Sequence, residues 1–303
     1  MRRRWWAVLA LVPVLLAAGC GDDDDAGSAS SENVAADGST SSGDETSGAR
    51  AELIVEAGDY VFELPDSVVE AGEVRLVVQN NGSEDHHLNI GRVASGADAA
   101  TVAEAIGSGD LSVLAELELV GGPNGVASGE SGAVTTELAA GSYVVFCEIP
   151  SVVDGVPHSQ KGMVGTFVVS EASDPAPEGA SAVGSAATTI TIGADGYDVP
   201  AGWDGTGVVE VANAYPGPAE MAVFRLADGA TVDDLMAFLA GEGPPGPPPF
   251  SLAGGVTALL PGRSAAVEFD LEPGVYVALS FLPDPEIGAP QAMSGLLTRF
   301  EIG

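Results

Sequence analysis

The chain has 303 residues, of which 46% are hydrophobic and only 6% aromatic. Its 44 acidic and 10 basic residues give a formal net charge of −34. Such a charge argues against nucleic acid or anionic lipid as a partner, because both would repel the protein.

The N-terminal segment has the organisation of a processing signal. Three arginines precede an apolar run over residues 5–18, which is shorter than the roughly 20 residues of a membrane-spanning helix. Residues 16–20 resemble a bacterial lipobox, although Ala17 stands where leucine is more usual. We therefore predict a lipoprotein signal peptide over residues 1–19 and a lipidated Cys20 that anchors the protein outside the cytoplasm at the bacterial cell membrane. An ordinary secretory peptide and an uncleaved anchor are the alternatives.

Residues 20–50 contain mainly Ser, Gly and Asp, with almost nothing apolar to bury. A segment of this composition stays disordered. A flexible coil of about 30 residues spans roughly 30 Å on average. We predict an acidic tether that holds a folded head away from the membrane.

Two β-type regions follow the tether. Both consist of short apolar runs bounded by Gly, Pro and Asn, the pattern of a β-sandwich. A Pro/Ala/Ser/Gly-rich linker at 171–187 separates a first domain over 51–170 from a second over 188–303. Helical inserts are expected at Thr101 to Glu118 and at Thr231 to Ala240. The predicted strands of the first domain include Glu52–Glu56, Tyr60–Glu63, Val74–Asn80, His87–Ile90, Ala133–Leu138, Ser142–Cys147 and Val164–Val169.

The two domains repeat each other at a constant offset of 133 residues. The segment Gly141–Pro150 matches Gly274–Pro283, and Asn80 matches Asn213. A repeat of this kind indicates two copies of one structural unit. The predicted fold class is therefore all-β, with two tandem sandwiches that each carry a short helical insert.

Cysteine and histidine are scarce, with two and three residues respectively. If Cys20 is lipidated, Cys147 has no disulfide partner in an oxidising compartment, and metal ligation gives a reason for its presence. His158 lies 11 residues after Cys147, and Met163 five residues after that. Two imidazoles, one thiolate and a weak axial thioether form the ligand set of a blue-copper site.

The other two histidines, His86 and His87, are adjacent after an Asn-containing turn. Because side chains alternate along a strand, His86 shares a face with the apolar Leu88 and Ile90. We therefore expect His86, rather than His87, to point into the sandwich as the remaining ligand.

The second domain lacks all four candidate ligands, although the spacings between their positions are the same in both copies. A single metal site in the first domain is the simplest explanation. The alternative is that the cysteine is a buried free thiol and the histidines are surface residues. At the offset of 133, His86, Cys147, His158 and Met163 are replaced by Ala219, Ser280, Gln291 and Leu296.

These segments resemble those of the cupredoxins. Residues 81–90 are similar to the segment that carries the first histidine ligand in plastocyanins, azurins and nitrite reductases. The Pro-His-x-x-x-Gly-Met-x-Gly sequence at 157–165 is closer to the copper nitrite reductases. The loop between Cys147 and His158, the ligand loop, is longer than in plastocyanins. The resemblance implies two tandem cupredoxin-like Greek-key sandwiches and one type 1 copper ion, held in the first by the four candidate side chains.

Two positions beside the candidate ligands depart from the cupredoxin pattern. Cupredoxins commonly place Asn after the first histidine, hydrogen-bonded to a Ser or Thr after the cysteine. Here those positions hold His87 and Glu148. A His87–Glu148 hydrogen bond that braces the site and responds to pH is one hypothesis. Solvated side chains at both positions, or Glu148 as a ligand, are the alternatives.

The loop between Cys147 and His158 is apolar for a connecting segment. In related proteins, redox partners dock on a hydrophobic patch around the second histidine. Val152, Val153 and Val156 are therefore candidates for a partner surface. Packing of these valines against the second domain is the alternative.

The sequence therefore predicts a membrane-tethered, monomeric copper protein that carries single electrons between redox partner proteins. Copper buffering or delivery, and an adhesion module that has retained copper, are the alternatives. A nitrite reductase or multicopper oxidase would need a second copper centre, linked through a histidine beside the cysteine. Phe146 precedes Cys147, and only His87 is left over, so we expect no enzymatic activity.

Overall fold

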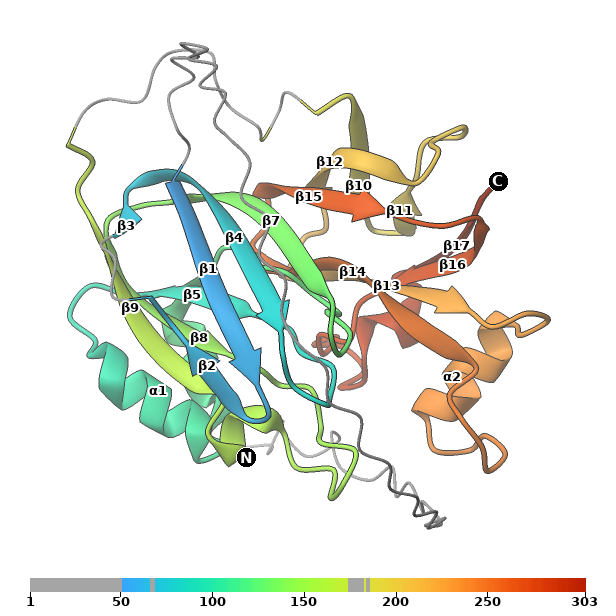
Figure 1. Cartoon of the computed structure of the whole chain (residues 1–303), viewed down its shortest axis with the longest axis horizontal. Coiled ribbons are helices and arrows are strands. Elements are labelled where there is room, and N and C mark those ends of the chain that lie inside the picture. The colour runs from blue at the N-terminus through green and yellow to red at the C-terminus, as the bar shows by residue number, and fades with distance from the viewer. Residues whose placement is uncertain (1–50, 66–68, 174–182, 184–185) are drawn as a thin grey trace, which may run out of the picture.

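The computed structural model describes residues 51–65, 69–173, 183 and 186–303 (Figure 1). The predicted signal peptide, the lipid anchor, the tether and most of the predicted linker lie outside these residues. Among the described residues, no helix is both long and apolar enough to cross a membrane.

Two β-sandwiches follow each other along the chain, which confirms the predicted all-β class (Figure 1). In the first, a buried core of aliphatic side chains lies between two layers of strands. One layer contains β1 (Ala51–Gly58), β2 (Val61–Glu63), β4 (Gly72–Asn80) and β7 (Ser131–Leu138). The other layer contains β3 (Val69–Glu70), β5 (Asn89–Val93), β6 (Leu117–Leu119), β8 (Gly141–Phe146) and β9 (Val164–Ser170).

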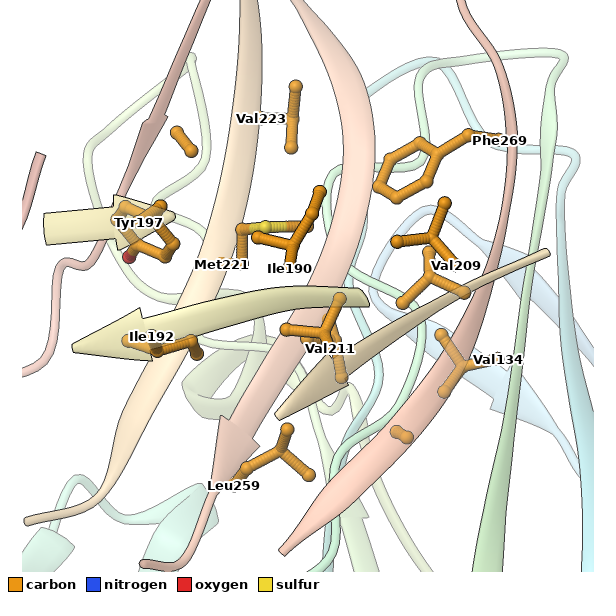
Figure 2. Close-up of a cluster of buried hydrophobic side chains, with 14 of the residues drawn as sticks. Val134, Ile190, Ile192, Tyr197, Val209, Val211, Met221, Val223, Leu259 and Phe269 are labelled. Atoms are coloured by element: carbon orange, nitrogen blue, oxygen red, sulfur yellow. The ribbon is translucent and has the colours of Figure 1, made fainter. Parts of the chain in front are cut away.

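The second sandwich has the same plan. Its core contains Ile190, Val211, Met221 and Phe269, contributed by both layers (Figure 2). One layer contains β10 (Thr188–Gly193), β11 (Gly196–Asp198), β12 (Thr206–Asn213) and β15 (Ser264–Asp270). The other contains β13 (Ala219–Leu226), β14 (Phe250–Leu259), β16 (Gly274–Leu279) and β17 (Leu297–Ile302).

Matching side chains in the two sandwiches make matching hydrogen bonds. Asn80 and Asn213 each donate from Nδ2 to the main-chain oxygens 4 and 46 residues further along the chain. Tyr143 and Tyr276 each donate from the hydroxyl to the main-chain oxygen 4 residues earlier. The pairs β1–β4 and β10–β12 are both parallel. The similarity of the halves therefore extends from sequence to individual contacts.

The two sandwiches share one continuous sheet. Strands β7 and β15 pair antiparallel, so that Val134 lies opposite Val267 and one eight-stranded sheet runs from β11 to β2. Val134 of the first sandwich also packs in the core of the second (Figure 2). This pairing covers a strand edge on each sandwich that would otherwise present unpaired main-chain groups.

The first helical insert is shorter than predicted. Helix α1 spans Ala99–Gly107, and the 3₁₀ helix η1 (Leu111–Glu116) and β6 follow it, where the sequence suggested one helix from 101 to 118. Gly109 has φ +85° and breaks the helical path, and Asp110 caps η1 by accepting from the Ser112 N–H. The second insert, α2 (Val232–Leu239), matches the prediction and begins with a capping box.

Candidate metal centre

His86 lies on an irregular segment just before β5. Its N–H donates to the Val126 oxygen (3.0 Å), and its own oxygen accepts from the Val126 N–H (2.8 Å). The predicted strand from His87 to Ile90 is wrong at its start, because β5 begins at Asn89. The Leu88 N–H donates to the oxygen of Pro123 (2.9 Å), which has no N–H to donate and so interrupts a regular ladder. The side chain of His86 is fully buried, as its alternation with Leu88 predicts.

Gly82 makes room for the His86 ring. A Cβ atom at this position would lie 2.8 Å from His86 Nε2 and 2.7 Å from Asp59 Oδ1. The turn between β4 and β5 therefore needs a glycine at position 82 because a side chain there would come too close to His86 and Asp59, and not because of a positive φ.

Strand β8 delivers Cys147 to the core. Val144 and Phe146 face helix α1, whereas Tyr143, Val145 and Cys147 belong to the core between the layers. Strict alternation along β8 therefore turns the thiol inward.

The ligand loop returns to Cys147 through main-chain hydrogen bonds. The Cys147 N–H donates to the Met163 oxygen (3.1 Å), and the Cys147 oxygen accepts from the Ser159 N–H (2.7 Å). His158 opens the 3₁₀ helix η2 (His158–Lys161), which Gly162 ends with φ +117°. These contacts fix the histidine beside the cysteine despite the length of the loop.

Three candidate ligand atoms converge. His86 Nδ1 lies 3.1 Å from His158 Nδ1, which lies 3.6 Å from Cys147 Sγ. All three atoms lie within 4.8 Å of one another, and all three residues are fully buried. A trigonal metal with bonds of about 2.0 Å to nitrogen and about 2.3 Å to sulfur needs separations of about 3.5 Å and 3.7 Å. The arrangement therefore fits a metal ion. Met163 is also fully buried, in the same core cluster as Cys147.

Burial keeps the three groups neutral when no metal is bound. It raises the pKa of the Cys147 thiol to about 12. Burial, with His158 as a neighbour, lowers the pKa of His86 to about 4. Burial also lowers the pKa of His158, against the opposing effect of Glu84. Neutral imidazoles are ready to bind a metal, whereas the thiol must release its proton on binding. Two imidazoles and one soft sulfur suit copper.

Glu84 completes the site, and our sequence analysis missed it. Its side chain is buried, and Oε2 accepts from His158 Nε2 (3.2 Å) and from the Val152 N–H (2.8 Å). Oε1 accepts from the Tyr60 hydroxyl (2.5 Å) and from Ser151 Oγ (3.0 Å). Burial by itself would raise the pKa of Glu84, but these four hydrogen bonds outweigh it and lower the pKa.

The predicted contact between His87 and Glu148 occurs through the main chain. His87 Nε2 accepts from the Glu148 N–H (2.8 Å) and also contacts Asn89 Nδ2 (2.8 Å). Burial lowers the pKa of His87 to about 3. The ring therefore stays neutral near pH 7, contrary to the pH-responsive brace that the sequence suggested. Glu148 is not part of the cluster of converging ligand atoms.

The second sandwich fills the equivalent space with neutral polar contacts. Ser280 Oγ donates to Gln291 Oε1 (2.7 Å), and both side chains are buried. Glu220, which stands where the first sandwich has His87, accepts from the Phe281 N–H (2.9 Å). Equivalent main-chain groups are therefore satisfied in both copies by different side chains.

The valines of the ligand loop differ in exposure. Val152 and Val153 are 56% and 77% exposed, and Val156 is half-buried. The first two therefore do not pack against the second sandwich. Val152 also donates its N–H to Glu84, so the exposed segment is one hydrogen bond from the residue that contacts His158.

No family model matches the chain, and no curated protein matches it. Among solved structures, auracyanin A from Chloroflexus aurantiacus, a blue copper protein, is 26% identical over 39% of this chain and 99% of its own, with a TM-score of 0.24. Auracyanin from Roseiflexus castenholzii is 24% identical over 41% of this chain and 98% of its own, with a TM-score of 0.26. The copper-containing nitrite reductase from Thermus scotoductus is 15% identical over 84% of this chain and 62% of its own, with a TM-score of 0.23. Both blue copper proteins and copper-containing enzymes are therefore among the similar structures.

Proposed function

We propose that the chain is a type 1 copper protein of the cupredoxin kind, which carries single electrons between redox partners. The observation that supports the proposal best is the convergence of His86 Nδ1, His158 Nδ1 and Cys147 Sγ in a fully buried cluster. Copper bound there would supply a one-electron couple, and Met163 is the candidate weak axial ligand.

The surroundings of the cluster favour electron transfer over copper delivery. A delivery site must expose its ligands to a second protein, whereas the three side chains here have 0% exposure. Each ligand is held by main-chain hydrogen bonds of its own segment. Ligands fixed in this way reorganise little when the charge of the ion changes, which speeds electron transfer.

A catalytic role is not part of the proposal. The chain contains three histidines, of which two belong to the cluster. His87 accepts a hydrogen bond from the Glu148 N–H, and Phe146 stands directly before Cys147. No histidine is therefore left to build a second copper centre beside the first.

The wider arrangement is also proposed. A lipid on Cys20 and the tether at 20–50 would hold the copper domain (51–170) outside the cell membrane. A linker (171–187) would lead to a ligand-free domain (188–303) that arose by duplication, and the protein would act as a monomer. The offset of 133 residues and the matched hydrogen bonds of the two halves support the duplication.

The exposed valines of the ligand loop are the proposed surface for redox partners. Val152 and Val153 present apolar side chains to solvent, and Val156 lies beside them on the same loop. Exposed apolar groups close to a buried redox site offer a short path to a docked partner.

Copper titration with visible spectroscopy and voltammetry tests the function. The copper-loaded protein should show an intense blue charge-transfer band and a reversible one-electron wave. Cys147→Ser should abolish the band, whereas Ser280→Ala, the equivalent position of the second domain, should leave it unchanged. A colourless copper complex, or a band that survives in Cys147→Ser, would refute the proposal. A colourless complex without a reversible wave would favour storage.

A further inference from the structure

The outer nitrogen of His158 is enclosed by protein. His158 has no exposed surface, and its Nε2 lies 3.2 Å from Glu84 Oε2. The Tyr60 ring packs edge-on against the imidazole, with centroids 5.1 Å apart. Lys161 Nζ lies 4.4 Å from the centre of the same Tyr60 ring. A carboxylate, rather than water, is therefore the partner of this ring nitrogen.

Glu84 is held in place by groups from two other segments. Tyr60 donates its hydroxyl to Oε1, and the ligand loop contributes Ser151 Oγ and the Val152 N–H. Tyr60 has φ +63°. It is the only non-glycine residue with a positive φ in the described part of the chain. A strained backbone that persists at a site indicates that its surroundings impose it. The position of the carboxylate is thus built by the fold rather than left to a flexible surface side chain.

The second sandwich serves as an internal control. Glu84 is replaced by Gly217 at the offset of 133. Tyr60 is replaced by Asp195, because the turn between β10 and β11 follows Gly193 as the turn between β1 and β2 follows Gly58. Gln291, which replaces His158, donates its Nε2 to the Pro218 oxygen (3.0 Å) instead. Neither Glu84 nor Tyr60 therefore has a like residue in the sandwich that lacks the ligands, so the fold itself does not require this pair.

We propose that Glu84 is a positioning residue that holds His158 as the Nε2–H tautomer, frees Nδ1 for the metal and favours the more highly charged oxidation state of copper. An ionised carboxylate can only accept, so Nε2 must carry the proton. The lone pair then lies on Nδ1, which faces Cys147 and His86. A carboxylate on the far nitrogen also raises the basicity of the ligating nitrogen. The metal-related part rests on the proposed function.

The tautomers of the metal-free protein follow from the same contacts. His86 Nδ1 and His158 Nδ1 are 3.1 Å apart, so one of them must donate. If Glu84 fixes the His158 proton on Nε2, the donor is His86 Nδ1–H. The His86 Nε2 atom is buried and has no hydrogen-bond partner among the described residues, which agrees with an unprotonated nitrogen there.

Nitrogen-15 NMR of the histidine rings in the metal-free full chain tests the tautomer directly. We expect Nε2–H on His158 and Nδ1–H on His86. Glu84→Gln keeps an oxygen acceptor and should preserve this pattern, whereas Glu84→Met should lose the hydrogen-bonded Nε2–H signal. A His158 Nδ1–H tautomer in the parent protein, or an unchanged signal in the Met variant, would overturn the proposal. This arm needs no copper, so it separates the role of Glu84 from the proposed function.

The second arm measures metals. Glu84→Gln should lower Zn²⁺ affinity about ten-fold. It should also shift the ratio of Cu(II) to Cu(I) affinity at least about ten-fold toward Cu(I), which equals about 59 mV for one electron. Asp85→Asn is the matched control, because it removes one charge from the adjacent half-buried residue. A shift of less than about three-fold in the control supports the direct contact, and equal shifts in both variants would overturn it.

Discussion

Glu220 should make the stability of the protein depend on pH, and Glu220→Gln should remove that dependence. The carboxyl group is buried between the sandwiches, where it accepts from the Phe281 N–H (2.9 Å) and from Asn124 Nδ2 (3.2 Å). Burial raises its pKa from 4.5 to about 7. The folded protein therefore binds this proton more tightly than the unfolded chain does.

The sign and the size of the effect follow from this difference. Because the native state holds more protons between pH 4.5 and 7, the free energy of unfolding falls as the pH rises through that interval. The loss is about 3 kcal/mol, at about 1.4 kcal/mol per pH unit. Glu220→Gln should match the parent near pH 4 and exceed its stability by about 3 kcal/mol above pH 8. For a unit of this size the melting temperatures should then differ by roughly 6–12 °C.

Thermal and urea unfolding of the metal-free proteins between pH 4 and pH 9 measure this difference. Glu242→Gln is the control, because Glu242 is an exposed carboxylate of the same domain. It should leave the pH dependence of the parent unchanged. A stability difference between the Glu220→Gln protein and the parent that does not vary with pH would refute the reasoning.

Three further predictions concern the site and its surface. Gly82→Ala places a Cβ 2.8 Å from His86 Nε2, so metal titration should show at least about ten-fold weaker copper binding; unchanged affinity would mean that the turn gives way. Arg75→Met removes exposed ion pairs, including one to Glu268 across the domains (2.7 Å). It should lower the free energy of unfolding in urea by less than about 1 kcal/mol, and high salt should abolish the difference from the parent. Val153→Glu should slow electron self-exchange, measured by NMR line broadening, about ten-fold at low salt without changing the potential; an unaltered rate would exclude this patch as the transfer surface.

The sequence was informative where residue types are scarce and the repeat supplied a comparison. Cys147 and His158 could be paired because few alternatives exist, and the alternation along β8 explains why the thiol points inward. Glu84 could not be recognised by type, because it is one of 44 acidic residues. Its role depends on how a turn folds against the ligand loop, which is a tertiary contact. The one available signal was its replacement by Gly217 in the copy without ligands.

The join between β7 and β15 was equally hidden, because any strand edge can pair with any other. Nothing in the local composition of β7 distinguishes it from the other strands that end a layer. The helical insert was overestimated for a local reason instead. The pattern of apolar residues continues past Gly107, but Gly109 adopts a positive φ and ends the helix there.

The second sandwich has none of the candidate ligands, yet it supports the segment that holds His86 in the first sandwich. Val126 pairs with His86 through two main-chain hydrogen bonds, and residues 120–126 lie against β14 of the second sandwich. Thr257 on β14 accepts from the Gly122 N–H (2.8 Å) and donates to the Leu88 oxygen (3.2 Å), so a single buried hydroxyl connects both sides of this segment. Because a buried N–H or C=O without a partner costs about 1–3 kcal/mol, these contacts strongly favour the observed path of the segment. The second sandwich therefore contributes to the geometry around His86 although it carries none of the candidate ligands.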